Sequence, residues 1–343
     1  MGERPSQMAR DISETPSIIE RQDPALARAL RDVLAPIRRR PPGIIVSCAR
    51  GSSAHAATFG KHLFERYMGL PVAAAAPSIA SVYRRRLHLR DQLVLAISQS
   101  GRSDDLIAFA SEARAAGALT VAVTNDSASP MARVCDFVLP IGAGPERGVA
   151  ATKTFIATAT VLARLAAAWA QNAQLTAALG RLPQRLVSAS RLDWKPAAER
   201  LSRAMHVTII GRGATLAIAQ EAALKLKEIC NLHAEAFSGA EFQHGPIALV
   251  ASGYPVLMFM PTDEAATSMR LLLGHLQRKN ADLLMTGGGT QANVCLAVLP
   301  SDHPETDALC LIQSFYAMTL GLAERLGIDA DRPRNLQKVT RTK

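Results

Sequence analysis

The most restrictive feature of this sequence is an order of segments that occurs twice. In the first half, an apolar run at residues 44–48 meets a turn that contains Gly51, and a helical pattern follows. In the second half, an apolar run at 207–210 meets Gly211-Arg212-Gly213 and another helical pattern. The other matched runs are 119–123 with 283–285, and 137–140 with 296–300, the last two leading to helical patterns at about 151–170 and 305–326. Apolar strands that alternate with helices are typical of a parallel sheet covered on both faces.

The chain of 343 residues is long enough for two such α/β domains in tandem. We expect a helical lead-in at 1–40, a first domain at 41–180, a second domain at 196–328 and a tail at 329–343. The lead-in helix is expected to begin near Thr15-Pro16, because proline is favoured in the first turn of a helix. Apolar periodicity weakens around 182–195, where we expect the join between the domains.

Charge and cysteine content narrow the classes of function. The net charge of +10 suits either nucleic acid or small phosphorylated ligands. The basic clusters Arg38–Arg40 and Arg84–Arg86 have no interleaved aromatic residues, so we expect solvated surface there and no nucleic-acid partner. Five scattered cysteines argue against a disulfide framework or a zinc site. Since the sequence has no metal-ligand cluster and no dinucleotide fingerprint, we expect neither a metal nor another cofactor.

No segment has the character of a membrane span or of a leader peptide. The longest apolar stretch, 155–170, is interrupted by Arg164 and is too short to cross a bilayer. The opening residues 1–10 are polar. We therefore expect a cytoplasmic protein without a membrane partner.

Three polar segments that follow predicted strands are candidates to bind a phosphorylated sugar. The run 93–97 ends in Ser98–Ser103 (SQSGRS), directly before a helix that begins near Asp104. Serine hydroxyls and backbone N–H groups at a helix N-terminus favour a phosphate. A single serine there is more simply a helix cap, but the whole cluster favours a ligand. Gly51-Ser52-Ser53 is a weaker candidate, and the segment 148–153 (GVAATK) is placed to close over a sugar.

A helix and the turn after it carry the side chains that proton transfer requires. Lys225 and Glu228 share a helix face at i, i+3, and His244 precedes Gly245-Pro246. Isomerisation of a sugar phosphate needs a base between C1 and C2, a group that opens the ring, and a cation near the developing charge. The simpler alternatives are a surface ion pair and a turn residue. The basic tail, by composition alone, is a frayed terminus.

These segments resemble the sugar isomerase (SIS) domain, and over nearly the whole chain they resemble the isomerase half of the glutamine–fructose-6-phosphate aminotransferases. The resemblance implies two tandem SIS domains, each with a mostly parallel five-stranded sheet in a flavodoxin-like three-layer α/β fold. It implies that the substrate is held by Ser98, Gln99, Ser100 and Ser103 around its phosphate, and by Ser53, Val149, Ala151 and Thr152. Ala151 stands where the aminotransferases usually carry a serine.

The resemblance also implies catalytic roles. Glu228 would move the proton between C1 and C2, with Lys225 as its charge partner. His244 would open the sugar ring in the site of a neighbouring subunit, so that a homodimer is required. Lys338, in the tail sequence RPRNLQK, would enter the sugar site and form an imine with the open-chain ketose or act as a cation.

The implied reaction is deamination of glucosamine 6-phosphate to fructose 6-phosphate and ammonia. Because only about 40 residues precede the first predicted domain, we expect no glutamine hydrolysis by this polypeptide. The alternatives within the same chemistry are a fructosamine-6-phosphate deglycase, a galactosamine-6-phosphate deaminase, an ammonia-dependent aminotransferase and a plain aldose–ketose isomerase. A non-catalytic sugar-phosphate sensor is a different class of function, and it would not need Glu228, His244 and Lys338 together.

Overall fold

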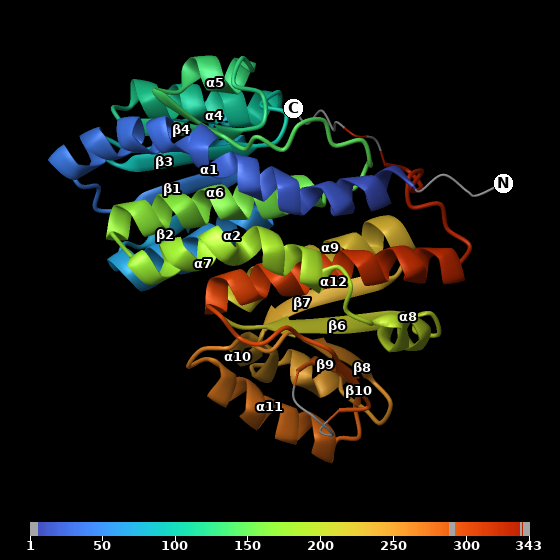
Figure 1. Cartoon of the computed structure of the whole chain (residues 1–343). Helices are drawn as coiled ribbons and strands as arrows, with labels where there is room; N and C mark the ends of the chain where they lie inside the picture. Colours follow the sequence, from blue (N-terminus) through green and yellow to red (C-terminus); the bar gives the residue numbers. More distant parts are fainter. Residues whose placement is uncertain (1–5, 288–291, 337, 339–343) are drawn as a thin grey trace. The chain divides into compact units, whose positions relative to one another are not determined.

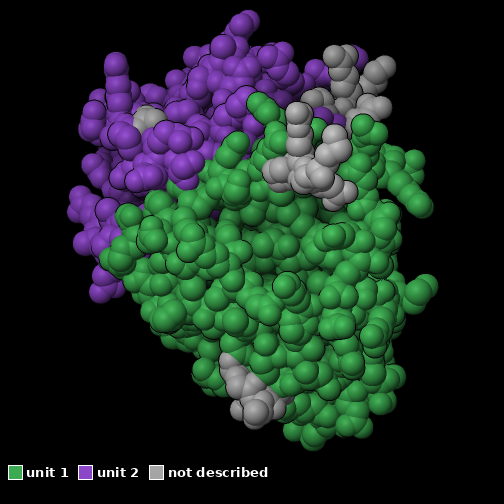
Figure 2. All heavy atoms as spheres, turned by 45° about the vertical axis from the view of Figure 1, so that its right-hand side comes forward, with its two compact units in different colours: residues 1–16, 147–152, 180–336 green, residues 17–146, 153–179, 337–343 purple. Residues whose placement is uncertain are grey.

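The chain divides into two compact units, and each is built around one sheet. The computed structural model describes residues 6–287, 292–336 and 338. Unit 1 comprises residues 1–16, 147–152 and 180–336, and unit 2 comprises residues 17–146, 153–179 and 337–343 (Figure 2). Of the predicted lead-in and tail, residues 1–5, 337 and 339–343 lie outside the described part of the chain.

Unit 2 contains sheet A, which is parallel throughout and has the strand order β2-β1-β3-β4-β5. Its strands are β1 Ile45–Ala49, β2 Val72–Ala74, β3 Leu93–Ser98, β4 Leu119–Thr124 and β5 Phe137–Pro140. Its helices are α2 Gly51–Met68, α3 Ser78–Ser81, α4 Asp104–Ala115, α5 Pro130–Val134 and α6 Lys153–Ala170. Helices α2 and α6 pack together on one face of the sheet, and α4 and α5 pack together on the other (Figure 1).

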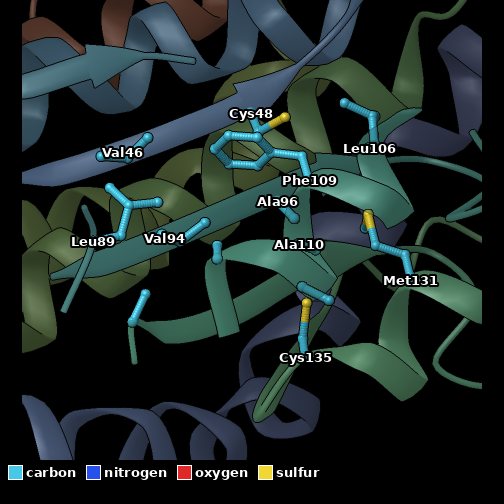
Figure 3. Close-up of a cluster of buried hydrophobic side chains, with 13 residues drawn as sticks. Val46, Cys48, Leu89, Val94, Ala96, Leu106, Phe109, Ala110, Met131 and Cys135 are labelled. Carbon is cyan, nitrogen blue, oxygen red and sulfur yellow. The ribbon is translucent and has the colours of Figure 1, made fainter. Parts of the chain in front are cut away.

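The strands of sheet A are apolar at successive positions because both of their faces are buried. Toward α4 and α5, Cys48, Val94 and Ala96 pack against Phe109 and Met131 (Figure 3). The alternate residues point to the opposite face, and they are buried as well: Ile45, Leu93, Leu95 and Ile97. This double burial explains the continuous apolar runs of the sequence.

Unit 1 contains sheet B, which is also parallel and has the order β10-β9-β8-β6-β7. Its strands are β6 His206–Gly211, β7 His233–Ser238, β8 Pro255–Met258, β9 Asp282–Thr286 and β10 Val294–Leu296. Its helices are α8 Lys195–Leu201, α9 Ala214–Cys230, α10 Gly239–Gln243, the 3-10 helix η1 Pro246–Leu249, α11 Ala266–Arg278 and α12 Pro304–Arg325. Helix α9 packs with α12, and α10 packs with α11. In the described part of the chain, no helix has the length and apolar character to cross a membrane.

The predicted repeat is confirmed by the order of the strands. Read from β7, sheet B has the order β7-β6-β8-β9-β10, which is the order of sheet A with each strand replaced by its counterpart. Thus β6 matches β1, β9 matches β4 and β10 matches β5, as the paired apolar runs predict. The prediction of two tandem α/β domains with parallel five-stranded sheets is confirmed. In this order the connections change direction between the neighbouring strands β1 and β3 of sheet A, and between β6 and β8 of sheet B. Sheets of this kind bind ligands at that point.

Two segments differ from the sequence-based expectation. Helix α7 (Ala173–Ala189) continues through Pro183, so the join expected around 182–195 is helical over its first half. Helix α1 (Gln7–Arg39) begins well before Thr15-Pro16 and continues through it, so that predicted start is wrong.

A tertiary hydrogen bond explains why α1 tolerates Pro16. Proline has no N–H to donate to the carbonyl four residues earlier, here Ile12. In unit 1 the Ile12 carbonyl instead accepts a hydrogen bond of 3.0 Å from Gln313 Nε2, and Gln313 is fully buried. The side chain of α12 therefore replaces the bond that the helix lacks.

Gln313→Leu is expected to lower the free energy of unfolding by about 1–3 kcal/mol, because the buried Ile12 carbonyl loses its donor. Urea denaturation followed by circular dichroism measures the change. Gln313 Nε2 also donates to Ser190 Oγ at 2.8 Å, and Ser190→Ala controls for that bond. Adding Pro16→Ala to Gln313→Leu supplies a helical N–H to Ile12. If this second change recovers none of the lost stability, the explanation is wrong.

The cysteines are thiols, and burial separates four of them from the fifth. Burial raises the pKa of Cys48, Cys135, Cys230 and Cys310 to about 12, so these thiols stay protonated and unreactive near neutral pH. Cys295 is exposed. We expect the native protein to react with one equivalent of a disulfide reagent at pH 8, and the denatured protein with five. Native Cys295→Ser protein should not react, and rapid reaction of a second native thiol would contradict this.

Candidate active site

The two serine-containing turns of unit 2 meet at the carboxyl edge of sheet A. The segment Ser98–Ser103 follows β3, and Gly51–Ser53 forms the first turn of α2 directly after β1. Strands β1 and β3 are neighbours, with Ala49 opposite Ile97. Because this is the point where the connections change direction, the structure brings Ser53 and the predicted phosphate segment together at the expected ligand position.

The backbone of the phosphate segment is fixed at Gly101. Its φ is +61°, and a Cβ there would lie 2.2 Å from Ser129 Oγ and 3.0 Å from Thr124 Oγ1. The Gly101 N–H donates to Ser98 Oγ at 3.2 Å, and the Arg102 N–H donates to Ser100 Oγ at 3.3 Å. Only glycine fits this turn, so the segment presents its hydroxyls in one defined conformation.

Helix capping does not explain why a serine stands at position 103. It is the N-cap residue of α4, but its side chain makes no capping hydrogen bond. The helix begins with Asp104 and Asp105, and the buried Asp105 pairs with Arg50, whose Nη2 is 2.5 Å from Asp105 Oδ2. Arg50 lies between β1 and α2, so this ion pair joins the two turns and compensates one of the negative charges.

Gly101→Ala is expected to destabilise the protein by about 2 kcal/mol or more, since a left-handed conformation and a steric clash both oppose the new methyl group. It should also weaken the phosphate binding that the sequence predicts here, because Ser98 and Ser100 are held by this turn. Gly69→Ala is the matched control: its φ is +63°, but a Cβ there meets nothing within 4 Å. Thermal unfolding measures both variants. Equal destabilisation would show that the clash with Ser129 does not matter.

The segment that carries Val149, Ala151 and Thr152 belongs to unit 1 and is held by a buried aspartate of α1. Both Arg147 N–H and Gly148 N–H donate to Asp11 Oδ2, at 2.9 and 2.7 Å. Asp11 is 2% exposed. Sequence reasoning did not select Asp11 as a site residue, because its partners lie more than 130 residues away and no local pattern marks it.

A buried cluster of charges lies on α9. Lys225 Nζ is 2.5 Å from Glu228 Oε2 and 3.4 Å from Glu221 Oε1, and Tyr316 Oη donates to Glu221 Oε1 at 3.2 Å. Glu221, Lys225 and Tyr316 are fully buried, whereas the Glu228 side chain is 22% exposed. The surface ion pair considered as an alternative is therefore wrong. Of the three charged groups, Glu228 alone reaches solvent.

His244 is not near Glu228 within one chain. Glu228 precedes β7 and lies on α9, while His244 follows β7 and α10. Strand β7 is six residues long, which places about 16 Å between its ends. In addition, α10 packs with α11 on one face of sheet B, and α9 packs with α12 on the other (Figure 1). His244 itself is exposed.

In unit 2, Lys338 lies close to a buried carboxylate. Its Nζ is 3.7 Å from Glu146 Oε2, and Glu146 is 7% exposed. Thr154 orients that carboxylate, because its N–H donates to Oε1 at 3.3 Å and its hydroxyl donates to Oε2. The tail lysine thus has a defined neighbour. Glu146 is a second residue that sequence reasoning missed, since it stands alone in a loop.

The described residues include no group of three or more histidine, cysteine, aspartate or glutamate side chains that could hold a metal ion.

A match to a model of a known protein family shows which family the chain belongs to. The model of the SIS domain matches residues 40–168 and 200–298, one region in each half of the chain. The chain belongs to the SIS domain family.

Relatives with sequence similarity to this SIS protein include glutamine–fructose-6-phosphate aminotransferases. A glutamine–fructose-6-phosphate aminotransferase from Symbiobacterium thermophilum is 37% identical over 318 residues, which are 86% of this chain and 50% of that protein. The enzyme of the same name from Pseudomonas syringae pv. tomato is 31% identical over 361 residues, or 96% of this chain and 58% of that protein. The chain spans about half the length of the curated relatives it matches.

Solved structures show the same fold over nearly the full chain. A protein from Silicibacter pomeroyi DSS-3, assigned as a phosphosugar isomerase, is 44% identical with a TM-score of 0.91, covering 95% of this chain and 100% of that one. The C-terminal domain of glucosamine-fructose-6-phosphate aminotransferase from Francisella tularensis has a TM-score of 0.86 at 24% identity, covering 96% of this chain and 99% of that one. This SIS protein is therefore related to the phosphosugar isomerases and to the aminotransferases.

Proposed function

We propose that this SIS protein is a phosphosugar isomerase that deaminates an amino sugar, converting glucosamine 6-phosphate and water to fructose 6-phosphate and ammonia. The observation that carries the proposal is the Glu221–Lys225–Glu228 cluster, in which a buried ammonium holds a partly exposed carboxylate. Relatives named for amino transfer involving fructose 6-phosphate support an amino sugar as the substrate. Deamination needs only water as its second reactant, whereas the reverse reaction needs supplied ammonia.

The chemistry requires one carboxylate to act twice. In the open-chain aldehyde, Glu228 removes the proton from C2, and the electron pair forms the C1–C2 double bond of an enolamine while the C1–O double bond becomes a single bond and its oxygen takes up a proton. The same carboxyl group returns the proton to C1, and loss of a proton from the nitrogen leaves a ketimine at C2. Water adds to C2, the C–N bond breaks, and ammonia leaves with fructose 6-phosphate as the other product. Lys225 is fully buried, so its role is to orient the Glu228 carboxylate through Oε2.

The 6-phosphate is assigned to the turns of unit 2. Ser98, Gln99, Ser100 and Ser103 offer hydroxyl, amide and backbone donors after β3, and Ser53 adds another in the first turn of α2. The N-terminus of α2 carries no acidic residue in its first turn, which favours an anion there. Val149, Ala151 and Thr152 are assigned to the sugar.

His244 is proposed to open the sugar ring in the site of a second copy of the chain. Its exposure and its separation from Glu228 within one chain support this assignment. Mixing Glu228→Gln chains with His244→Ala chains should restore activity, because some sites in the mixed homodimers contain both intact residues. Absence of activity in verified mixed dimers would contradict the sharing of sites.

Lys338 is proposed to contact the open-chain sugar, either as an imine or as a cation. The buried Glu146 carboxylate beside its Nζ supports this, because a carboxylate can exchange a proton with an amine. Borohydride reduction in the presence of fructose 6-phosphate would trap an imine as a stable adduct on Lys338.

The decisive experiment is incubation with glucosamine 6-phosphate, followed by assay of both ammonia and fructose 6-phosphate. Equal amounts of the two products support the proposal. Galactosamine 6-phosphate, N-acetylglucosamine 6-phosphate and fructoselysine 6-phosphate test the alternative substrates in parallel. Tight binding of these compounds without turnover of any would overturn the enzyme assignment and leave a sugar-phosphate sensor.

A further inference from the structure

Unit 1 contains a cavity whose lining includes none of the residues placed in the proposed reaction. The space within it, including the part that is open to solvent, is about 810 Å³, and it lies at the carboxyl edge of sheet B. Met260 and Thr262 follow β8, and Met285 and Thr286 come from the end of β9. Side chains of α7, α11 and α12 complete the lining.

The repeat gives this cavity a counterpart in unit 2. Strands β8 and β9 of sheet B match β3 and β4 of sheet A, and β3 is the strand that leads into Ser98–Ser103. The cavity therefore occupies the place in unit 1 that the serine segment occupies in unit 2. In unit 1, however, Phe259-Met260-Pro261 replaces the serines, so the chemistry that favours a phosphate is missing and an apolar surface takes its place.

The charged groups of the lining are two guanidinium groups and one carboxylate. Asp307 is saturated: its Oδ1 accepts from Arg185 Nη2 at 2.8 Å, and its Oδ2 accepts from Thr262 Oγ1 at 2.9 Å and from Ser301 Oγ at 2.8 Å. Arg185 Nε is buried and has no acceptor among the described residues. Arg270 is exposed on α11, and within the described ranges it has no ion pair.

We propose that this cavity binds a small organic carboxylate with an apolar chain or ring. The lining carries one net positive charge, which matches a monoanion. A phosphate carries nearly two negative charges at neutral pH and would lie beside Asp307. The carboxylate accepts from Arg270 and lies beside the positive charge of Arg185, and the apolar part contacts Met260, Met285 and Leu273. This site is independent of the proposed deamination.

Isothermal titration calorimetry with 4-phenylbutyrate tests the proposal. We expect binding to one site per chain, which persists when glucosamine 6-phosphate is present. The neutral 4-phenylbutanamide should bind about tenfold more weakly, because it loses the charge-assisted hydrogen bonds. Arg270→Gln should lower the affinity for 4-phenylbutyrate by a similar factor. Arg278 is an exposed arginine of the same helix and lies outside the lining, so Arg278→Gln should leave this affinity unchanged.

A cavity-filling variant separates this site from binding elsewhere. Val298 lines the cavity and is 40% exposed, so Val298→Trp fills the cavity without disturbing the core. It should abolish binding while its thermal unfolding matches that of the parent protein. The proposal is overturned if millimolar 4-phenylbutyrate gives no binding heat, if Arg270→Gln binds it as tightly as the parent, or if glucosamine 6-phosphate displaces it.

Discussion

Glu228→Gln is expected to reduce kcat for deamination of glucosamine 6-phosphate by about 10³-fold, since a positioned general base contributes roughly 10²–10⁴ to such a proton transfer. The amide keeps the size of the side chain and still accepts a hydrogen bond from Lys225, but it cannot hold the proton between C2 and C1. KM should change little, because phosphate binding is assigned to the turns of unit 2.

The control for this prediction is Glu199→Gln, which removes an exposed carboxylate from α8. It should leave both kcat and KM unchanged. Exchange of the C2 proton of glucosamine 6-phosphate with deuterated solvent, followed by NMR, isolates the proton-transfer step. If Glu228→Gln exchanges this proton at the parent rate, Glu228 is not the base.

Lys225→Met is expected to destabilise the protein by about 3–5 kcal/mol, because it leaves the Glu221 carboxylate buried without its cation. Glu221 is fully buried, and it also accepts a hydrogen bond from Tyr316 Oη. Loss of the ammonium also frees the Glu228 side chain, so activity should fall together with stability.

A double variant distinguishes this charge effect from lost packing. Glu221→Gln in the Lys225→Met background removes the uncompensated charge and keeps an acceptor for Tyr316. Urea denaturation should show that the double variant recovers most of the stability that Lys225→Met loses. A double variant that is no more stable than Lys225→Met would show that the buried charge is not the cause.

The sequence was sufficient for the architecture because each strand is buried on both faces and so is apolar throughout. The paired runs at 44–48 and 207–210 predicted the repeat, and the turns after β1 and β3 were predicted as a ligand position. The serine cluster was visible because its residues are adjacent in the sequence.

Features that depend on distant partners were not predictable. The start of α1 depends on Gln313, which lies about 300 residues from Ile12. Asp11 and Glu146 carry no local pattern, since their partners define their roles. Glu228 lies before β7, so the rule that ligands bind after strands does not identify it. The Lys225–Glu228 spacing suggested an ion pair, but only the packing of α12 shows that it is buried.

The division of unit 1 into three separate stretches has a consequence for synthesis on the ribosome. Residues 6–16 belong to unit 1, but the strands of sheet B begin only at His206. The first turns of α1 therefore emerge long before Gln313, and at about 5–20 residues per second the interval is on the order of 20 s. Unit 2 can assemble during that time. The N-terminal turns must wait for the last helix, so completion of unit 1 is a late event that couples the two ends of the nascent chain.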